Sequence, residues 1–301
     1  MPMHPTRQGE LNVLLSTLLG SVLPVITILS FTYVPPLLSA GMSTLFAGLY
    51  FAFLLTVKRE WPLLQKRAAW KNILLATFFI GIAGYGCLFL GLKFTTAGNA
   101  SILNLTEVFF SFLILGLFLH HEPLLPRTII GASCMVFGAL LVLLPKGTGE
   151  WQWGNLLILV GAALAPFGNR YAQRARRIVS TNVIMLYRSI ISGICLLLIA
   201  LAIEEIPSRD ALLSSLVFLS INGVLLLGLS VSLWVEGIHR IPITKAVAMV
   251  SIMPLFTLAA AYFVLHEQPS FLQVTALLPI TAGMVLLTKS TKIPMEVASG
   301  T

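Results

Sequence analysis

Charge is scarce in this chain. Only 10% of its 301 residues are Asp, Glu, Lys or Arg, whereas soluble globular proteins typically carry about 25%. So few charged side chains cannot cover a soluble surface of this size, which excludes a soluble enzyme, a secreted domain and a disordered chain. Apolar residues are abundant instead: 57% are hydrophobic, and the mean hydropathy is +0.94. This composition predicts a polytopic membrane protein whose surface faces lipid.

Cysteine is equally scarce. Cys87, Cys134 and Cys195 all lie in apolar runs and form no C-x-x-C pair, so we expect no disulfide framework and no zinc site. His121-Glu122 and His266-Glu267 resemble half of an H-E-x-x-H zinc motif, but neither copy has the second histidine. The sequence also carries no nucleotide-binding motif and no set of a nucleophile with its base. We therefore predict no catalytic residue, metal or cofactor.

Long hydrophobic runs define the fold class. A membrane-crossing helix needs about 20 mostly apolar residues. Ten such runs occur, at residues 11–33, 36–57, 72–91, 96–119, 128–144, 153–169, 182–203, 212–234, 243–266 and 271–287. We interpret the first as a retained span rather than a cleaved signal peptide. The prediction is an all-α polytopic membrane protein with ten transmembrane helices.

The distribution of basic residues predicts the orientation. With the N-terminus inside, cytoplasmic segments hold fifteen of the nineteen Lys and Arg residues, and outer segments hold only Lys93, Lys146 and Arg209. Cytoplasmic loops carry such an excess, so both termini are expected in the cytoplasm of a bacterial-type inner (plasma) membrane. The same rule explains the net charge of +8 without a nucleic-acid partner.

The chain resembles itself at an offset of 145 residues. Residues 119–122 (LHHE) align with 264–267 (VLHE), Phe118 with Phe263, and Gly138 with Gly283, while Ser43 falls opposite Arg188. Each repeat then holds five spans. Because five is odd, the second repeat enters the membrane upside down, which is a transporter architecture. We divide the chain into a tail (1–10), a first repeat (11–145), an inverted second repeat (153–288) and a second tail (289–301).

With these features, the chain resembles the drug/metabolite transporter superfamily, EamA type. The resemblance rests on Glu122 and Glu267 at helix junctions, on residues 251–256 (SIMPLF) in the ninth span, and on residues 186–188 (LYR) in the seventh. It covers about residues 11–290. The resemblance implies export of small polar metabolites, often amino acids or their derivatives, without ATP.

Glu107 is the most informative polar residue. It lies midway along the fourth predicted span, where an ionisable group costs at least ~2.5 kcal/mol and should face a bundle interior or a wet cavity. Asn104 and Ser111, at i−3 and i+4, share its helix face. Glu107 is predicted to bind a substrate ammonium, a proton, or both. The alternative is a structural carboxylate that accepts a hydrogen bond from a neighbouring helix.

Arg188 is the second candidate, about two turns into the seventh span. Its planar guanidinium could pair both oxygens of a substrate carboxylate. The alternative is an arginine that snorkels or packs.

The remaining candidates are weaker. Lys245, near a membrane edge, is a candidate gate or else a solvated charge. The other polar residues within spans are candidate substrate ligands that could equally be structural: Tyr85, Asn222, Tyr187 and Ser251.

The sequence as a whole predicts a secondary transporter. We expect an inner-membrane exporter that alternates access around a cavity containing Glu107 and Arg188, for a zwitterion such as an amino acid or an amino-acid-derived metallophore. Proton antiport is one expected coupling, because burial disfavours a charged carboxylate and so favours proton uptake. Facilitated export is the alternative. The expected partners are a small-molecule substrate, membrane lipids and coupling protons, in a monomer or weak dimer. The rival hypotheses are a membrane-embedded enzyme and a non-transporting partner subunit.

Overall fold

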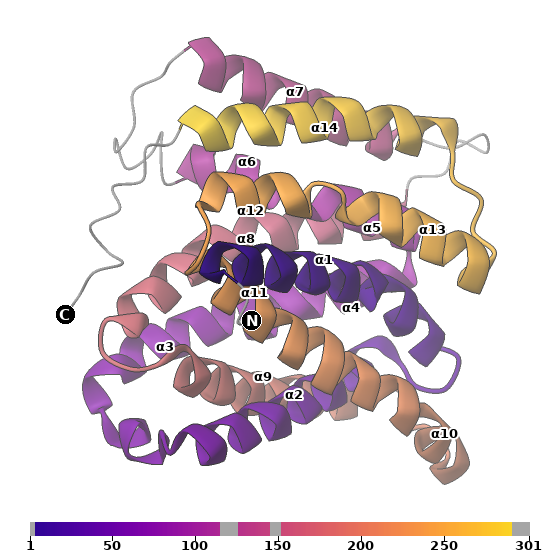
Figure 1. Cartoon of the computed structure of the whole chain (residues 1–301). Helices are drawn as coiled ribbons and strands as arrows, with labels where there is room; N and C mark the ends of the chain where they lie inside the picture. The colour runs from indigo at the N-terminus through magenta and orange to yellow at the C-terminus, as the bar shows by residue number, and fades with distance from the viewer. Residues whose placement is uncertain (1–3, 115–125, 145–151, 291–301) are drawn as a thin grey trace.

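The computed structural model describes residues 4–114, 126–144 and 152–290, and these ranges contain helices and turns but no strand. The first repeat holds α1 (Pro5–Ser30), α2 (Pro36–Lys58), α3 (Trp70–Ala76), the π-helical segment η3 (Thr77–Gly84), α4 (Tyr85–Lys93), α5 (Ala97–Asn104), α6 (Glu107–Ser111) and α7 (Pro126–Leu143) (Figure 1). Two short 3₁₀ turns, η1 (Trp61–Gln65) and η2 (Arg67–Ala69), join α2 to α3.

The second repeat has the same order of elements. It holds α8 (Trp153–Arg176), α9 (Thr181–Ile203), α10 (Arg209–Ser220), the π-helical segment η5 (Ile221–Leu229), α11 (Ser230–Ile238), α12 (Ile243–Val250), α13 (Met253–Leu265) and α14 (Phe271–Ser290). The third and eighth spans are therefore composite (α3–η3–α4 and α10–η5–α11), and so are the fourth (α5–α6) and ninth (α12–α13).

The predicted fold class is confirmed. Eight of the described helical segments are long and apolar enough to cross a membrane, and α14 adds a shorter apolar stretch, Phe271–Leu287. The remaining span, α8, has 24 residues but carries polar residues near both ends, including Asn155 and Arg174. The protein is an all-α polytopic membrane protein with ten transmembrane helices in two inverted five-helix repeats.

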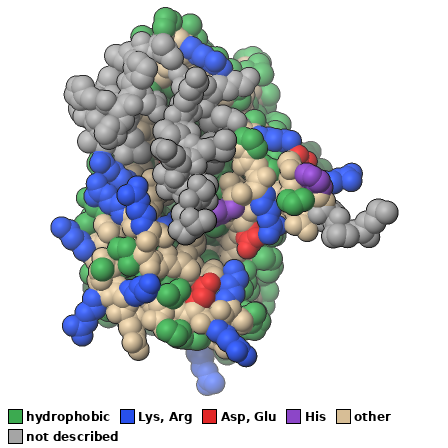
Figure 2. Space-filling model, turned by 60° about the vertical axis from the view of Figure 1, so that its left-hand side comes forward, with side chains coloured by type: hydrophobic (Ala, Val, Ile, Leu, Met, Phe, Trp, Pro, Cys, Tyr) green, Lys and Arg blue, Asp and Glu red, His purple; other side chains and the backbone are tan. Residues whose placement is uncertain are grey.

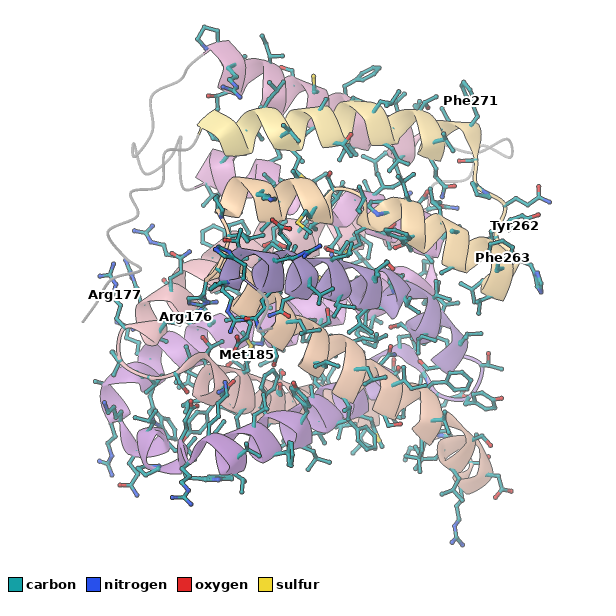
Figure 3. The ribbon with its side chains drawn as sticks, in the orientation of Figure 1. Arg176, Arg177, Met185, Tyr262, Phe263 and Phe271 are labelled. Carbon is teal, nitrogen blue, oxygen red and sulfur yellow. The ribbon has the colours of Figure 1, made fainter. Side chains whose placement is uncertain are left out.

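Each span presents one apolar face to lipid and another to the bundle. On α2, Leu49, Phe53 and Val57 are more than 60% exposed and lie at helical spacing, whereas Phe51 and Leu55 are fully buried. Exposing Leu49, Phe53 and Val57 to water would be unfavourable, but the apolar lipid solvates these side chains well. Aromatic residues mark one membrane edge: Tyr262, Phe263 and Phe271 project outward at the junction of α13 and α14 (Figure 3).

The two span boundaries that differ most from the prediction do so for a physical reason. Helix α1 begins at Pro5 rather than at residue 11, and α8 continues through Arg176 rather than ending at residue 169. Hydrophobicity marks the part of a helix inside the lipid, but arginine and glutamine are good helix formers and extend the helix into water. Both extensions therefore carry polar residues.

Small residues allow the closest helix packing. In the α7–α14 pair, which forms one edge of the bundle in Figure 1, a Cβ on Gly283 would lie 2.5 Å from the carbonyl oxygen of Gly131. The reciprocal distance, from a Cβ on Gly131 to the carbonyl oxygen of Gly283, would be 3.0 Å. Neither position can hold a larger residue without a shift of backbone, so these glycines fix the α7–α14 crossing.

The two ends of the bundle differ in charge. Lys and Arg side chains are spread over the face at which α1 begins and α14 ends (Figure 2). We call this the basic face. Its described members include Lys58, Arg67, Arg174, Arg240 and Lys245. The other end, which holds Lys93, Glu204 and Glu267, is called the opposite face.

Candidate functional site

Irregular backbone occurs at corresponding places in the two repeats. The π-helical segments η3 and η5 match at the 145-residue offset to within one residue. The helix also breaks at residues 105–106 in the fourth span and at residues 251–252 in the ninth, again at corresponding positions. Discontinuous helices at equivalent positions point to the substrate site of transporters, and π-helical turns often occur at functional sites. Both segments still cross as the predicted fourth and ninth spans, over Ala97–Ile114 and Lys245–Leu265 in the described residues.

A cavity of about 290 Å³ lies beside both breaks. We call it the central cavity. Its wall comes from α1, α4, α5, α6, α11, α12, α13 and α14, and is mostly apolar. The lining residues are Gly20, Leu23, Pro24, Leu88, Ala100, Ser101, Asn104, Leu105, Glu107, Val108, Trp234, Val247, Val250, Met253, Thr257 and Met284. An apolar wall with a few polar groups is typical of small-molecule sites.

Glu107 is the only ionisable group in that lining. It is the first residue of α6, directly after the break, and its Oε1 accepts a hydrogen bond of 2.7 Å from Nδ2 of Asn169 on α8. None of the ion pairs in the described ranges includes Glu107. Asn104, one turn earlier, also lines the cavity, as expected from the spacing. The carboxyl group thus has a structural partner in Asn169 and no cationic partner within the described ranges.

Arg188 does not line the central cavity, and it forms no ion pair with Glu107. It is 7% exposed, and its Nη2 donates a hydrogen bond of 3.2 Å to Oη of Tyr85, whose ring centroid lies 5.7 Å from the guanidinium. Its Nε has no hydrogen-bond partner among the described residues. The structure thus brings together two predicted residues, Arg188 and Tyr85, and leaves a buried cation without a carboxylate partner in the part of the chain that it describes.

Asn222 is fully buried within η5. Its Nδ2 donates a hydrogen bond of 3.2 Å to Oγ1 of Thr27 on α1, but its Oδ1 has no partner in the described ranges. Ser43, the repeat counterpart of Arg188, likewise has an unpartnered Oγ within those ranges. Buried polar atoms are nearly always satisfied, so these atoms mark places where a water or substrate would complete the hydrogen bonding.

Like Arg188, Tyr85 and Asn222, three further predicted residues are not part of the central cavity lining. Tyr187 donates a hydrogen bond of 3.1 Å to the carbonyl oxygen of Leu64, and its ring contacts that of Trp70. Ser251 returns its hydroxyl to its own helix, to the carbonyl oxygen of Ala248 at 2.8 Å. Ser111 is the last residue of α6. Tyr187 and Ser251 thus make their hydrogen bonds within the protein.

Lys245 joins two helices at the basic face. Its Nζ lies 2.6 Å from Oε1 of Glu10, which connects the start of α12 to the start of α1. Nearby, Nη1 of Arg240 donates a hydrogen bond of 3.3 Å to Oε1 of Gln8. These contacts close the basic-face side of α1 and α12, both of which line the central cavity.

The opposite face has a corresponding closure that sequence reasoning missed. Asn99 of α5, 1% exposed, donates through Nδ2 to Oε1 of Gln152 at 2.8 Å and to Oδ1 of Asn155 at 3.2 Å. Its Oδ1 accepts a hydrogen bond of 2.7 Å from Nε2 of Gln273 on α14. We call Asn99, Gln152, Asn155 and Gln273 the amide cluster. Asn155 is the repeat counterpart of Glu10.

Sequence reasoning also missed Asn169, because its contact with Glu107 is made between two helices and does not follow from spacing along either one. The available signal was positional: Asn155 and Asn169 are amides on the same predicted span, and an amide in a span needs partners.

Comparisons with known proteins agree with the fold. The EamA-like transporter family matches the chain twice, over residues 7–144 and 152–289. The uncharacterized transporter YoaV of Bacillus subtilis is 23% identical over 258 residues, which cover 85% of this chain and 88% of that protein. The uncharacterized transporter YetK of the same organism is 23% identical over 271 residues, covering 87% and 81%. A solved crystal structure that is 18% identical superposes with a TM-score of 0.65 over 92% of this chain and 95% of its own.

Proposed function

The chain belongs to the EamA-like transporter family, and we propose that it is a secondary exporter of a bacterial-type inner membrane. Its cargo is a small polar metabolite, an amino acid or an amino-acid derivative such as a metallophore. Transport proceeds by alternating access, in which one repeat moves against the other around the central cavity. The relatives' names as transporters support a non-enzymatic function.

One observation carries this proposal: Glu107, the only ionisable group among the described residues that line the central cavity, lies at the helix break that both repeats share. A carboxylate in an apolar wall attracts a cationic group, and the ammonium of a zwitterion is such a group. Asn169 orients the carboxylate through Oε1. Asn104 is placed to add a hydrogen bond to the same cargo.

Arg188 is proposed as the partner of the cargo carboxylate in another state of the cycle. Its guanidinium has a free Nε within the described ranges and is held by Tyr85 rather than by a carboxylate. A neutral phenol is a weaker partner for guanidinium than a carboxylate, so a substrate carboxylate would replace it favourably. Asn222 and Ser43 supply further unpartnered polar atoms along the bundle.

Energy coupling is proposed to use the same carboxylate. Without an ion-pair partner in the described ranges, Glu107 can take up either a proton or the cargo ammonium. If these two compete, proton uptake on one side drives cargo release on that side. Proton antiport then requires no second ionisable group in the central cavity.

The two closures are proposed as gates. Lys245 and Glu10 would separate when the basic face opens, and the amide cluster would separate when the opposite face opens. The excess of Lys and Arg supports a cytoplasmic position for the basic face, and hence for both termini.

Reconstituted transport tests the proposal. Purified protein in liposomes, preloaded in turn with each standard unlabelled L-amino acid, should accumulate the labelled form of its cargo by counterflow. Protein-free liposomes give the background. Exchange of at least one zwitterion supports the proposal. If none of these amino acids, nor any amino-acid-derived metallophore tested the same way, exchanges above background, the proposed cargo class is wrong.

A further inference from the structure

A second cleft opens between the basic-face ends of α2, α9 and α11. Its volume is about 360 Å³, and no described residue lines both this cleft and the central cavity. Helix α11 separates them, because Val231, Ser232 and Val235 face the cleft whereas Trp234 lines the central cavity. We call this the basic-face cleft.

The rim of the cleft carries charges of both signs. Glu236 lies 3.0 Å from Nη2 of Arg240 and 3.9 Å from Nζ of Lys58. The side chains of Lys58 and Glu236 are 45% and 47% exposed, and half-exposed ion pairs are weak because water screens them. A ligand with its own opposite charges can therefore replace them without leaving a buried charge unpaired.

Glu60 supplies a second carboxylate on the other side of the rim. The preceding residue, Arg59, has a φ of 54°, so the chain turns sharply at the end of α2. Oε2 of Glu60 then accepts hydrogen bonds from Oγ of Ser180 at 2.6 Å and from Nδ2 of Asn182 at 3.0 Å, both at the start of α9. The carboxylate is thereby held in place by two neutral donors rather than by a cation.

Apolar side chains and the hydroxyl of Ser232 line the cleft away from its charged rim. Phe51, Met185 and Val231 line it, and Figure 3 places Met185 deeper in the bundle than Arg176 at the edge of the basic face. Ser232 also lines the cleft, and its Oγ is buried with no hydrogen-bond partner among the described residues. This hydroxyl is available to a ligand that reaches the cleft floor.

From this arrangement we propose that the basic-face cleft is a second binding site for a small free zwitterion. Its ammonium would contact Glu236, with Glu60 on the same rim, its carboxylate would contact Arg240 or Lys58, and its polar side chain would reach Ser232. Two carboxylates at the rim disfavour a phosphate or other polyanion, and the two cations disfavour a polyamine. The proposal rests on the proposed function for the identity of the ligand, the transported zwitterion.

Counting bound ligand tests the proposal. Protein in nanodiscs of phosphatidylglycerol alone is equilibrated with each radiolabelled standard L-amino acid. Wild type should bind about two equivalents per chain of the cargo. Glu107→Gln and Glu236→Gln should each retain about one, because removing one charge-assisted contact weakens its own site about tenfold. Glu205→Gln, an exposed carboxylate of the opposite face, is the matched control and should bind as wild type does.

The two proposals fail differently. If the central cavity binds no zwitterion but the cleft does, wild type binds one equivalent that Glu236→Gln weakens and Glu107→Gln does not. If the cleft is not a site, wild type binds one equivalent that only Glu107→Gln weakens, and the inference is overturned. Binding of no amino acid by any variant also overturns it.

Chemical protection locates the ligand independently of these charge changes. In a variant with Cys87, Cys134 and Cys195 replaced by alanine, Asn182→Cys should be alkylated several-fold more slowly at saturating amino acid. Adding phosphatidylethanolamine to the nanodiscs distinguishes a lipid headgroup from a free zwitterion. Protection that appears with this lipid alone, and not with an amino acid, contradicts the proposal.

Discussion

On the basic face, α1 of the first repeat is joined to α12 of the second by the ion pair of Glu10 and Lys245, whose side chains are 35% and 51% exposed. On the opposite face, the equivalent helices α8 and α5 are joined by the buried amides of Asn155 and Asn99. Inverted repeats thus place two closures of different chemistry at corresponding positions. An exposed ion pair contributes about 0–1 kcal/mol, whereas breaking a buried amide network leaves polar groups without partners. The basic-face closure is expected to open more easily.

The largest expected effect concerns which compartment each closure faces. A reporter enzyme that is active only in the cytoplasm should be active when fused after Arg67, because the basic face carries the excess of Lys and Arg. A reporter that is active only in the periplasm should be active when fused after Pro269. The measurement is paired enzymatic reporter activity in intact cells. Reversal of both signals would exchange the inner and outer closures.

The amide cluster should be the more costly closure to remove. Asn99→Ala removes partners of Gln152, Asn155 and Gln273, and should cost about 1–3 kcal/mol of the free energy of unfolding. The measurement is thermal unfolding in detergent, with Asn104→Ala, whose side chain is exposed, as the control. Equal midpoints for the two variants would mean that the cluster adds no stability.

Much of the fold was predictable from the sequence, because lipid imposes long apolar helices and charge sets their ends. The ten spans, their order and the inverted repeat follow from these two constraints and are confirmed. The breaks at residues 105–106 and 251–252 were not predictable from hydrophobicity, since the broken ninth span is as apolar as the spans formed by α2 and α7. The junction at residues 119–126, where a turn was predicted, lies largely outside the described residues.

The candidate site was predictable only in part. Glu107 and Asn104 share the central cavity because helical spacing fixes which residues share a face. Arg188 lies elsewhere, beside Tyr85, because contacts between helices depend on packing angles that sequence spacing does not contain. Asn169, Glu10 and the amide cluster were missed for the same reason.

Substitution of Arg188 should have the next largest effect, which is a loss of affinity for the cargo. Arg188→Lys retains the charge but loses the planar fork, so cargo affinity should fall about tenfold, and Arg188→Ala should lower it further. Counterflow at graded cargo concentrations measures this affinity, and the yield of folded protein is recorded beside it. Normal affinity with reduced yield would identify Arg188 as a packing residue held by Tyr85.

The basic-face closure should give the smallest effect. Lys245→Gln removes an ion pair of at most about 1 kcal/mol, which shifts a conformational equilibrium by roughly fivefold or less. Alkylation of Ser101→Cys in the cysteine-free variant reports opening, because Ser101 lines the central cavity. The rate should rise in Lys245→Gln and, equally, in wild type at high salt, while Lys71→Gln stays unchanged. A salt-independent rate would show that the pair is not the closure.

The role of Glu107 is tested most directly by counterflow of the identified cargo in Glu107→Gln, measured across pH and normalised to reconstituted protein. The glutamine keeps the shape and the contact with Asn169 but loses the charge. Exchange should fall about tenfold or more and lose its pH dependence, while Glu205→Gln matches wild type. Glu107→Gln that exchanges cargo at the wild-type rate with the wild-type pH profile would contradict this account.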